Sequence, residues 1–560
     1  MSSSTSDLTA TATAALDVAV ARRTFLRSAL VGGGVILTPG LLAACSRPGT
    51  SGSNTPAETP TGPANTDGEL IFAVDQLTGT SDPGSFASFG NWMVIDCIAR
   101  GLTHVDYVSS EPKPALAESW TVSDDQLVYT FKIRSGVKFH DGNTVSAKDF
   151  ERSWRRLFDE SDPTRDPTTY ASSELGGANV KSYQALDDAT FEVKLAAPDV
   201  AFLGRCSNPN SVALSSAAIE AKGAKIGQSL VGSGPYKFVS FTAGQSVVLE
   251  RFDDYWEGKP TLSKVVFQIL PDPSSLVSAL SSNAVNATCF APVSNVARLK
   301  SSGLVVEEAK PYIDIYLGMN LSKPTLADQK VRQAINLAID RQAVVSSVFA
   351  GAAAVPGGMV TPAELGYDDS LKALSTQDVD KAKALLTEAG AVGKSISLIT
   401  LNILFWPALG QVIEANLTAI GLKPKVEYLD SATFSDRAVK NQHEVFLEQR
   451  SAFVADPDNK LTPLLAGDSS YNQQWLRVES LLPEKQKQFD QLLTAARGEP
   501  DQAKRKDLYV QLQTYWTEEI LATAMVAYRY LPTVQQSNVQ NLNPDALGTY
   551  RTFFEKATVG

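Results

Sequence analysis

The chain has 560 residues, of which 43% are hydrophobic, and its formal net charge is −11. A chain of this length exceeds what one core of ordinary size holds, so we expect two or three packed units. The acidic balance argues against a nucleic-acid partner, because phosphate binding requires clustered Lys and Arg, and it agrees with a monomeric protein.

The N-terminal segment is typical of an export signal. Arg22 and Arg23 begin the run Arg-Arg-Thr-Phe-Leu-Arg, and residues 28–44 after it are uncharged. That stretch is short and weakly apolar for a membrane span. The run resembles a twin-arginine export signal, and an ordinary secretory signal that happens to carry two arginines is the alternative. We therefore predict an export signal over residues 1–44.

A cysteine ends the uncharged stretch. The sequence Leu-Ala-Ala-Cys at residues 42–45 resembles the bacterial lipobox, in which the cysteine thiol receives a diacylglycerol group. Residues 46–68 hold no aliphatic side chain larger than Ala, so they cannot bury apolar surface and are predicted to form a flexible tether. Residues 45–68 would then hold the folded part at the outer face of the cytoplasmic membrane, through lipid on Cys45 alone.

From residue 69 onward the hydrophobic pattern alternates between strand and helix periods. Leu127, Tyr129, Phe131 and Ile133 alternate with polar residues, which predicts a strand with one buried face, paired through a turn with 120–122. Further strands are expected at 247–249 and 265–269. Helices are predicted after Ser146, with Phe150, Trp154, Leu157 and Phe158 on one face; after Asp328, with Val331, Ile335, Ala338 and Ile339; over 382–389, ended by Gly390; and over 412–420, ended by Gly421. The interleaving indicates the α/β class.

The sequence offers little that could carry catalysis. His104, His140 and His443 lie in no metal-binding or nucleophile motif. The glycine-rich stretch 232–235 lacks the lysine of a phosphate loop, and Pro235 removes a backbone N–H. We expect neither an enzyme, nor a metal, nor a cofactor.

Four cysteines are present, and none is close enough to another to form a CxxC motif. If Cys45 is lipidated, Cys97, Cys206 and Cys289 remain. These three form either one disulfide, by any of three pairings, or three buried free thiols.

A series of short motifs runs through the rest of the chain. In order and spacing they resemble the family 5 extracellular solute-binding proteins, the oligopeptide- and dipeptide-binding proteins of ABC importers, over residues 69–555. The motifs are Pro114–Trp120, Gly136–Gly142, Ala147–Phe150, Gly232–Phe238, Asp254–Trp256, Leu326–Ala334, Ala338–Arg341, Lys381–Leu386 and Asp456–Asn459.

The resemblance implies a fold and a function. The fold would be the large, two-lobed α/β fold of peptide-binding periplasmic binding proteins, with a hinge between the lobes. Lobe one would comprise residues 69–308 and 528–560, and lobe two residues 309–527. The protein would bind a small ligand, a peptide, between the lobes and deliver it to ABC permease subunits.

The resemblance also implies which residues contact ligand. A first-lobe contact loop falls on Phe89, Gly90 and Asn91, and a contact tyrosine falls on Tyr170. The remaining candidates lie near the two chain crossings or on a lobe-two loop: Tyr312 and Asp314 at the first crossing, Tyr528 at the second, and Trp406 on the loop.

One position departs from the family pattern. Many peptide-binding relatives have an aspartate for the peptide amino terminus where this chain has Phe453. A buried ammonium without a counter-charge is costly, so either another carboxylate such as Asp314 replaces it or the ligand lacks a free α-amine. Arg450 could pair with a ligand carboxylate.

Three alternatives to peptide transport remain open on the sequence. The same fold could bind an oligosaccharide, an opine or a metal chelate, and Phe453 with Trp406 would suit sugar stacking. It could also serve as an envelope or signalling lipoprotein without transport. An exported hydrolase is the third alternative, and it lacks a recognisable motif.

Overall fold

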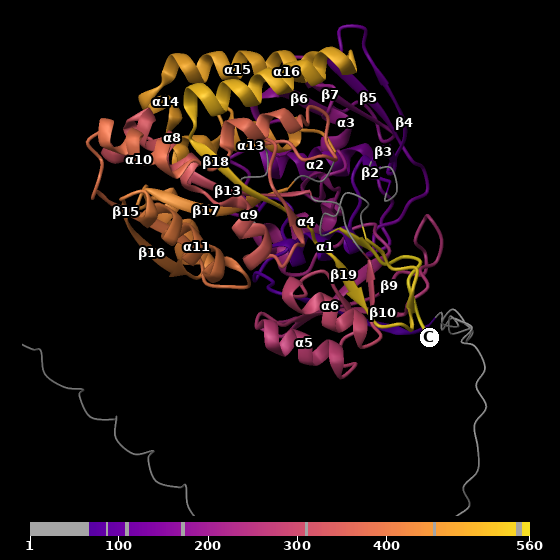
Figure 1. The fold of residues 1–560 in the computed structure, drawn as a ribbon. Helices are drawn as coiled ribbons and strands as arrows, with labels where there is room; N and C mark the ends of the chain where they lie inside the picture. Colours follow the sequence, from indigo (N-terminus) through magenta and orange to yellow (C-terminus); the bar gives the residue numbers. More distant parts are fainter. Residues whose placement is uncertain are drawn as a thin grey trace, which may run out of the picture. The chain divides into compact units, whose positions relative to one another are not determined.

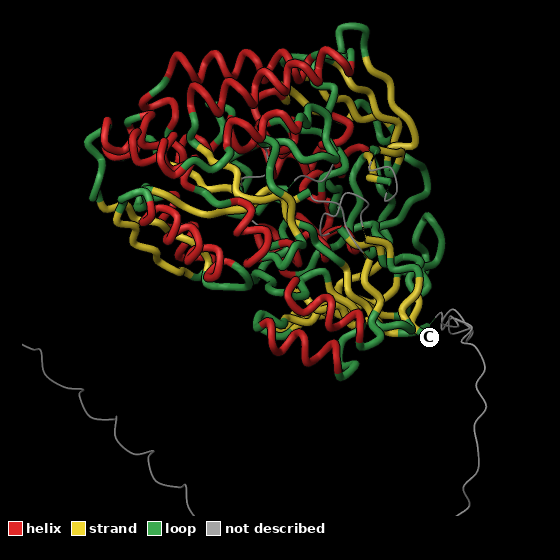
Figure 2. Tube along the Cα trace, viewed as in Figure 1, coloured by secondary structure: helices red, strands yellow, loops and turns green. Residues whose placement is uncertain are grey.

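The structure is a computed structural model that describes residues 67–85, 88–106, 111–167, 169, 174–307, 312–451, 455–544 and 551–560. Three larger sheets organise these residues, with seven, four and six strands (Figure 1). We call the residues of the seven- and four-stranded sheets the first lobe and those of the six-stranded sheet the second lobe. Figure 2 shows helices and strands interleaved in both.

The seven-stranded sheet of the first lobe is mixed. Its order is β12 (Val305–Glu307), β19 (Thr533–Gln535), β11 (Ala287–Thr288), β1 (Glu69–Val74), β10 (Lys264–Ile269), β9 (Ser246–Arg251) and β8 (Tyr236–Thr242). β1 runs parallel to β10 and β11, and the other pairs are antiparallel. In its core the rings of Phe72, Phe267 and Phe554 meet edge to face, with centroids 5.4–6.1 Å apart. The helices of this part are α1 (Phe89–Ile98), α4 (Ser216–Lys222), α5 (Pro273–Ser281) and α6 (Val293–Ser301).

The four-stranded sheet is antiparallel and has its own core. Its order is β4 (Ala117–Val122), β5 (Val128–Ile133), β7 (Thr190–Leu195) and β6 (Val180–Ala185). Helix α2 (Ala147–Phe158) packs against β6 and β7, and its Trp154 ring meets Phe191 edge to face at 5.3 Å. Ser146 and Asp149 form the capping box that begins α2. Short pairs complete the lobe: β2 (Thr103–Val105) with β3 (Pro112–Pro114), β20 (Val539–Gln540) with β23 (Thr558–Val559), and β21 (Asn543–Pro544) with β22 (Thr552–Phe553).

The six-stranded sheet forms the second lobe. Its order is β14 (Ala353–Ala354), β18 (Thr523–Arg529), β13 (Ile313–Met319), β17 (Val445–Arg450), β15 (Ser395–Leu401) and β16 (Lys423–Leu429). β13 is antiparallel to both neighbours, whereas β15 is parallel to both of its own. The longer helices are α8 (Gln329–Ala338), α10 (Val379–Glu388), α11 (Trp406–Ala419), α12 (Ser431–Val439), α13 (Asp458–Leu465), α15 (Pro483–Gly498) and α16 (Gln502–Tyr515). α15 and α16 pack side by side (Figure 1).

The predicted elements are confirmed, with small shifts at their ends. The strands expected around residues 127–133, 120–122, 247–249 and 265–269 are β5, β4, β9 and β10, and the four expected helices are α2, α8, α10 and α11. Ile339 lies just beyond α8 and is still buried. The helix expected from residue 412 begins earlier, at Trp406, because Pro407 supplies a favourable first turn.

Cys97, Cys206 and Cys289 are buried free thiols, so of the two alternatives the disulfide is wrong. Among the residues that the structure describes, no helix combines the length and the hydropathy that crossing a membrane requires.

Candidate functional site

The chain passes between the two lobes twice. It leaves the seven-stranded sheet after Glu307 and enters the six-stranded sheet at Ile313, and it returns between Arg529 and Thr533. β13 and β18 are antiparallel neighbours, so the second-lobe ends of both crossings lie side by side, with Asp314 opposite Tyr528. Two residues that the sequence placed in the site are therefore adjacent strand partners.

Tyr312 lies immediately before β13 and is fully buried. It joins none of the three large cores, and the hydrophobic residues against it are Ala363 and Ala455. The Nζ atom of Lys460, which the sequence analysis did not single out, lies 5.4 Å above the centre of the Tyr312 ring. Tyr312 is thus part of a polar region at the first crossing rather than of a hydrophobic core.

Asp314 shares that lysine with a second carboxylate. Lys460 Nζ lies 2.6 Å from Asp314 Oδ2 and 2.5 Å from Glu364 Oε2, and all three side chains are buried. The backbone N–H and the hydroxyl of Thr361 also donate to Glu364 Oε2. The other oxygens, Asp314 Oδ1 and Glu364 Oε1, are buried without a hydrogen-bond partner among the described residues. We call Asp314, Glu364 and Lys460 the carboxylate–lysine cluster.

The electrostatics of this cluster leave it short of positive charge. Burial raises the pKa of Asp314 to about 7, and Glu364 adds to the rise while Lys460 opposes it. Burial lowers the pKa of Lys460, but attraction to the two carboxylates outweighs burial and raises it overall. Above the pKa of Asp314, two ionised carboxylates and one ammonium sum to one surplus negative charge, which a cationic group could neutralise.

Arg450 and Tyr528 are engaged within the protein. Arg450 Nη2 lies 2.9 Å from Glu174 Oε1 in the first lobe, an ion pair that joins the lobes. The Tyr528 hydroxyl lies 2.8 Å from Gly358 O and from Val360 O, and it holds the loop after β14. These contacts give both residues a structural task beside any contact with ligand.

The predicted first-lobe loop forms the start of α1. Asn91 accepts a hydrogen bond from Thr78 N at 2.9 Å and donates to Thr80 O at 2.9 Å, so its amide holds the segment after β1. A Cβ atom on Gly90 would lie 2.7 Å from Gln76 O, so glycine is required for this close approach. Phe89, half-buried, packs against Trp92 with ring centroids 5.6 Å apart.

The prediction that Trp406 lies on a loop is wrong. Trp406 begins α11, is only 2% exposed, and packs in the core of the second lobe. The preceding residue, Phe405, is half-buried. Its ring lies beneath the guanidinium of Arg529, 4.6 Å away.

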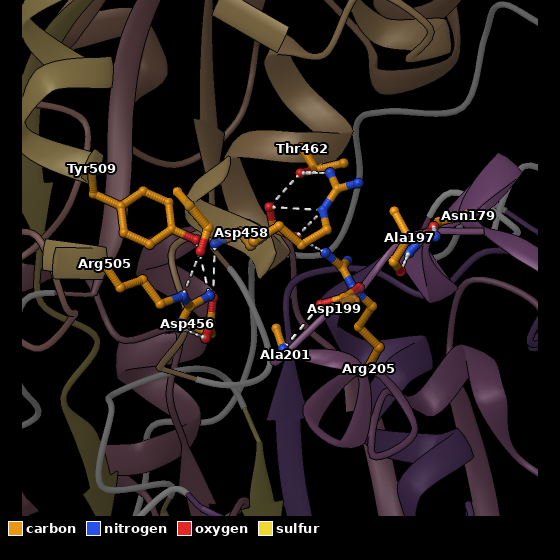
Figure 3. Close-up of polar contacts among 12 residues, drawn as sticks. Asn179, Ala197, Asp199, Ala201, Arg205, Asp456, Asp458, Thr462, Arg505 and Tyr509 are labelled. Carbon is orange, nitrogen blue, oxygen red and sulfur yellow. Dashed lines mark hydrogen bonds and ion pairs between the residues drawn. The ribbon is translucent and has the colours of Figure 1, made fainter. Parts of the chain in front are cut away.

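A second ion-pair cluster joins the lobes away from the crossings (Figure 3). Arg205, at the end of α3 (Phe202–Arg205) in the first lobe, donates to Asp199 at 2.9 Å and to Asp458 of the second lobe. Arg497 lies 3.2 Å from the same Asp458 carboxylate and donates to Thr462 at 2.6 Å. Arg205 and Asp458 are both completely buried, so water is excluded from this contact.

Several predicted positions lie outside the described residues. They are Arg22, Arg23, Cys45, Tyr170 and Phe453. Sequence reasoning missed Glu364, Lys460 and Arg529, and one signal was available for Lys460, since it directly follows the Asp-Pro-Asp-Asn motif at 456–459.

Comparison with known proteins places this arrangement in a family. A family profile described as "Bacterial extracellular solute-binding proteins, family 5 Middle" matches residues 111–472. Heme-binding protein A of Haemophilus influenzae is 28% identical over 72% of this chain and 77% of its own, and the dipeptide-binding protein of Escherichia coli K12 is 27% identical over 80% and 87%.

A solved structure also supports the family match. The ABC transporter-associated periplasmic binding protein DppA of Helicobacter pylori, in complex with the peptide STSA, matches with a TM-score of 0.80 and 27% identity, over 88% of this chain and 98% of its own. The two-lobed α/β fold that the sequence predicted is therefore confirmed, and these relatives are binding proteins rather than enzymes. The chain belongs to the bacterial extracellular solute-binding proteins of family 5.

Proposed function

We propose that the protein binds a peptide with a free α-amine between its lobes and delivers it to the permease subunits of an ABC importer. The observation that carries the choice of ligand is the carboxylate–lysine cluster, with its surplus negative charge and its two unbonded carboxylate oxygens. An ammonium group would neutralise that charge and donate to both oxygens. Asp314 and Glu364 would thus replace the aspartate that position 453 lacks.

The comparisons support the peptide class without deciding it. One of the relatives described above is named for dipeptides and another was solved with a bound peptide, whereas a third is named for heme, which favours a non-peptide solute as the second candidate. A neutral oligosaccharide would leave the surplus charge of the cluster unmatched inside a closed protein, a costly arrangement. We therefore place peptide first and a solute with another cationic group second.

We propose further that the protein works as a monomer on the outer face of the cytoplasmic membrane, held by lipid on Cys45. The resemblance of residues 42–45 to a lipobox and the composition of residues 46–68 support the anchor. The twin-arginine run at Arg22 and Arg23 supports export of the folded protein. In this arrangement a tethered binding protein stays close to its permease, which raises its effective concentration there.

Native mass spectrometry of the gently purified protein tests the ligand class. A distribution of added masses that fits short peptides is expected. A sugar ladder or a single non-peptide mass would contradict the peptide proposal and leave the fold unaffected. If the protein carries no added mass, it is screened by thermal shift with peptides and with glycans. Stabilisation by glycans alone would also contradict the peptide proposal.

The substitution Asp314→Asn tests the role of the cluster. Loss of one charged hydrogen-bond acceptor should weaken binding of a free-amine peptide roughly 10- to 100-fold and leave the N-acetylated peptide nearly unchanged. Because burial raises the pKa of Asp314 to about 7, wild-type affinity for the free amine should strengthen as the pH rises through 7. Asp507→Asn, at an exposed position of α16, makes the same chemical change and serves as the control.

A further inference from the structure

Arg529 ends β18 at the second chain crossing and is 5% exposed. The one hydrogen bond of its guanidinium runs from Nη1 to Gln449 Oε1, at a long 3.3 Å, and its Nε atom is buried without a partner among the described residues. It forms no ion pair within the part of the chain that the structure describes. A guanidinium has five N–H donors, so most of this group's hydrogen-bonding capacity is unused.

Two other buried arginines of the second lobe show how the fold ordinarily satisfies this group. Arg332 donates to the backbone carbonyls of Ile520, Leu326 and Ala327 at 2.8–3.0 Å. Arg341 donates to backbone carbonyls as well, among them Met525 O at 2.8 Å and Asn336 O at 3.1 Å. Among the described residues neither forms an ion pair with a carboxylate, yet the Nε and Nη1 atoms of both donate to backbone carbonyls. Arg529 differs because no backbone carbonyl of the described residues accepts a hydrogen bond from its guanidinium.

Asp75 acts on the charge of Arg529 but is not its hydrogen-bond partner. Asp75 follows β1 in the first lobe, and its charge and that of Arg529 attract each other, yet the two side chains form no ion pair. Asp75 instead accepts a hydrogen bond from Gln76 N at 2.8 Å. Burial raises the pKa of Asp75 to about 6 and lowers that of Arg529 to about 10, so each charged form lacks the stabilisation that a direct pair would give.

The position of Arg529 places it where a bound solute would lie under the proposed function. Arg529 is at the end of a second-lobe strand, and Asp75, the carboxylate whose charge acts on it, belongs to the first lobe. Next to Asp75, Gln76 Oε1 lies 3.4 Å from the hydroxyl of Ser431, a further contact between the lobes. The ring of Phe405 supports one face of the guanidinium and leaves its N–H edge for another partner.

We propose that Arg529 binds a carboxylate group of the solute. This inference rests on the proposed function and narrows it to ligands with a free carboxylate. A planar guanidinium matches a carboxylate through two parallel hydrogen bonds, and the buried positive charge requires an anion that the described residues do not supply. Asp75 acts as the competitor: its ionised form repels the ligand carboxylate, and its protonated form can donate to it.

The test compares peptide acids with their C-terminal amides. The full-length chain is titrated with di- and tripeptides in both forms, as wild type and as Arg529→Gln, Arg529→Lys and Arg298→Gln. Arg298 is exposed on α6, so Arg298→Gln removes the same charge at a surface position. Wild type should prefer the acids roughly 10- to 100-fold, Arg298→Gln should keep this preference, Arg529→Lys should keep part of it, and Arg529→Gln should lose it.

Equal wild-type affinity for acids and amides would overturn the assignment, as would a preference that survives in Arg529→Gln. If Arg529→Gln does not fold, the comparison of acids with amides on the wild-type protein still tests whether a ligand carboxylate is bound. If no peptide binds, the peptide proposal fails, but the carboxylate proposal can still be tested. The ligand that co-purifies with the protein is then treated to form methyl esters, and the added mass shows whether it carries carboxyl groups. A carboxyl-bearing ligand that is lost from Arg529→Gln supports the assignment. A ligand without carboxyl groups, or no uptake of any carboxylate by either route, overturns it.

Discussion

The substitution Asp75→Asn isolates the cost of burying one carboxylate between the lobes. The Asp75 side chain is buried, and its Oδ1 accepts a hydrogen bond from Gln76 N at 2.8 Å. Asparagine has nearly the same shape and keeps an Oδ1 acceptor for that bond, but it carries no charge. The variant therefore mimics the protonated form of Asp75 at every pH.

The expected magnitude follows from the pKa. Burial raises the pKa of Asp75 from its ordinary 3.8 to about 6, so the folded protein holds this proton more tightly than the unfolded chain does. The free energy of unfolding must then fall as the pH rises from about 4 to about 6, and the loss is complete above that range. At about 1.36 kcal/mol per pKa unit, the loss is about 3 kcal/mol. Asp75→Asn should regain up to about 3 kcal/mol at pH 7.5 and almost nothing at pH 4.

Urea unfolding followed by tryptophan fluorescence, at several pH values from 4 to 7.5, measures the difference between variant and wild type. Asp507→Asn is the control for the same chemical change at an exposed position and should shift stability little at any pH. An Asp75→Asn gain of equal size at pH 4 and 7.5 would show that charge is not its cause. A loss at pH 7.5 would refute the reasoning, since it would mean that ionised Asp75 stabilises the fold through Arg529.

Three further substitutions test other parts of the structure. Asp458→Asn should lower stability by about 3–5 kcal/mol in thermal or chemical unfolding, because Arg205 and Arg497 lose a shared buried partner, and small-angle scattering should detect a more open protein; an unchanged stability would contradict this. Gly90→Ala should cost about 1–3 kcal/mol, because its Cβ would lie 2.7 Å from Gln76 O, whereas Gly79→Ala, with nothing within 4 Å, should cost far less. Cys45→Ala should move the protein from the membrane fraction to the soluble or secreted fraction, and continued membrane retention would refute lipidation at this position.

The parts of the fold that local sequence determines were predictable. The Ser146 and Asp149 capping box begins α2, and Asp328 caps α8 by accepting from Lys330 N at 2.8 Å. Alternation over residues 128–133 predicts β5, whose inward residues are Tyr129, Phe131 and Ile133. Capping and alternation are interactions between residues a few positions apart, and so they can be recognised without knowledge of the tertiary structure.

The candidate site was predictable only in part, because its chemistry depends on residues far apart in the chain. Asp314 was identified, but its partners come from positions 364 and 460, and no periodicity links them. Trp406 was misplaced although Pro407 after it favours a helix start, a signal that outweighs the expectation of a loop. Arg529 offered no signal, because its distinguishing property is that no backbone carbonyl of the described residues accepts from it, which only the packed structure reveals.

The charged groups between the lobes fall into two kinds, and the difference suggests how they are used. Arg205 has Asp199 as a second partner within its own lobe, and Asp458 has Arg497, so separation of the lobes would break the Arg205–Asp458 contact without leaving either charge alone. Arg529 and the carboxylate–lysine cluster have no such additional charged partner among the described residues. A charged group whose contact forms and breaks repeatedly needs a partner in both the open and the closed protein. A group that binds a solute instead needs hydrogen-bond donors or acceptors that are still unused in the closed protein. Under the proposed function, the doubly paired charges serve closure and the under-paired charges serve the ligand.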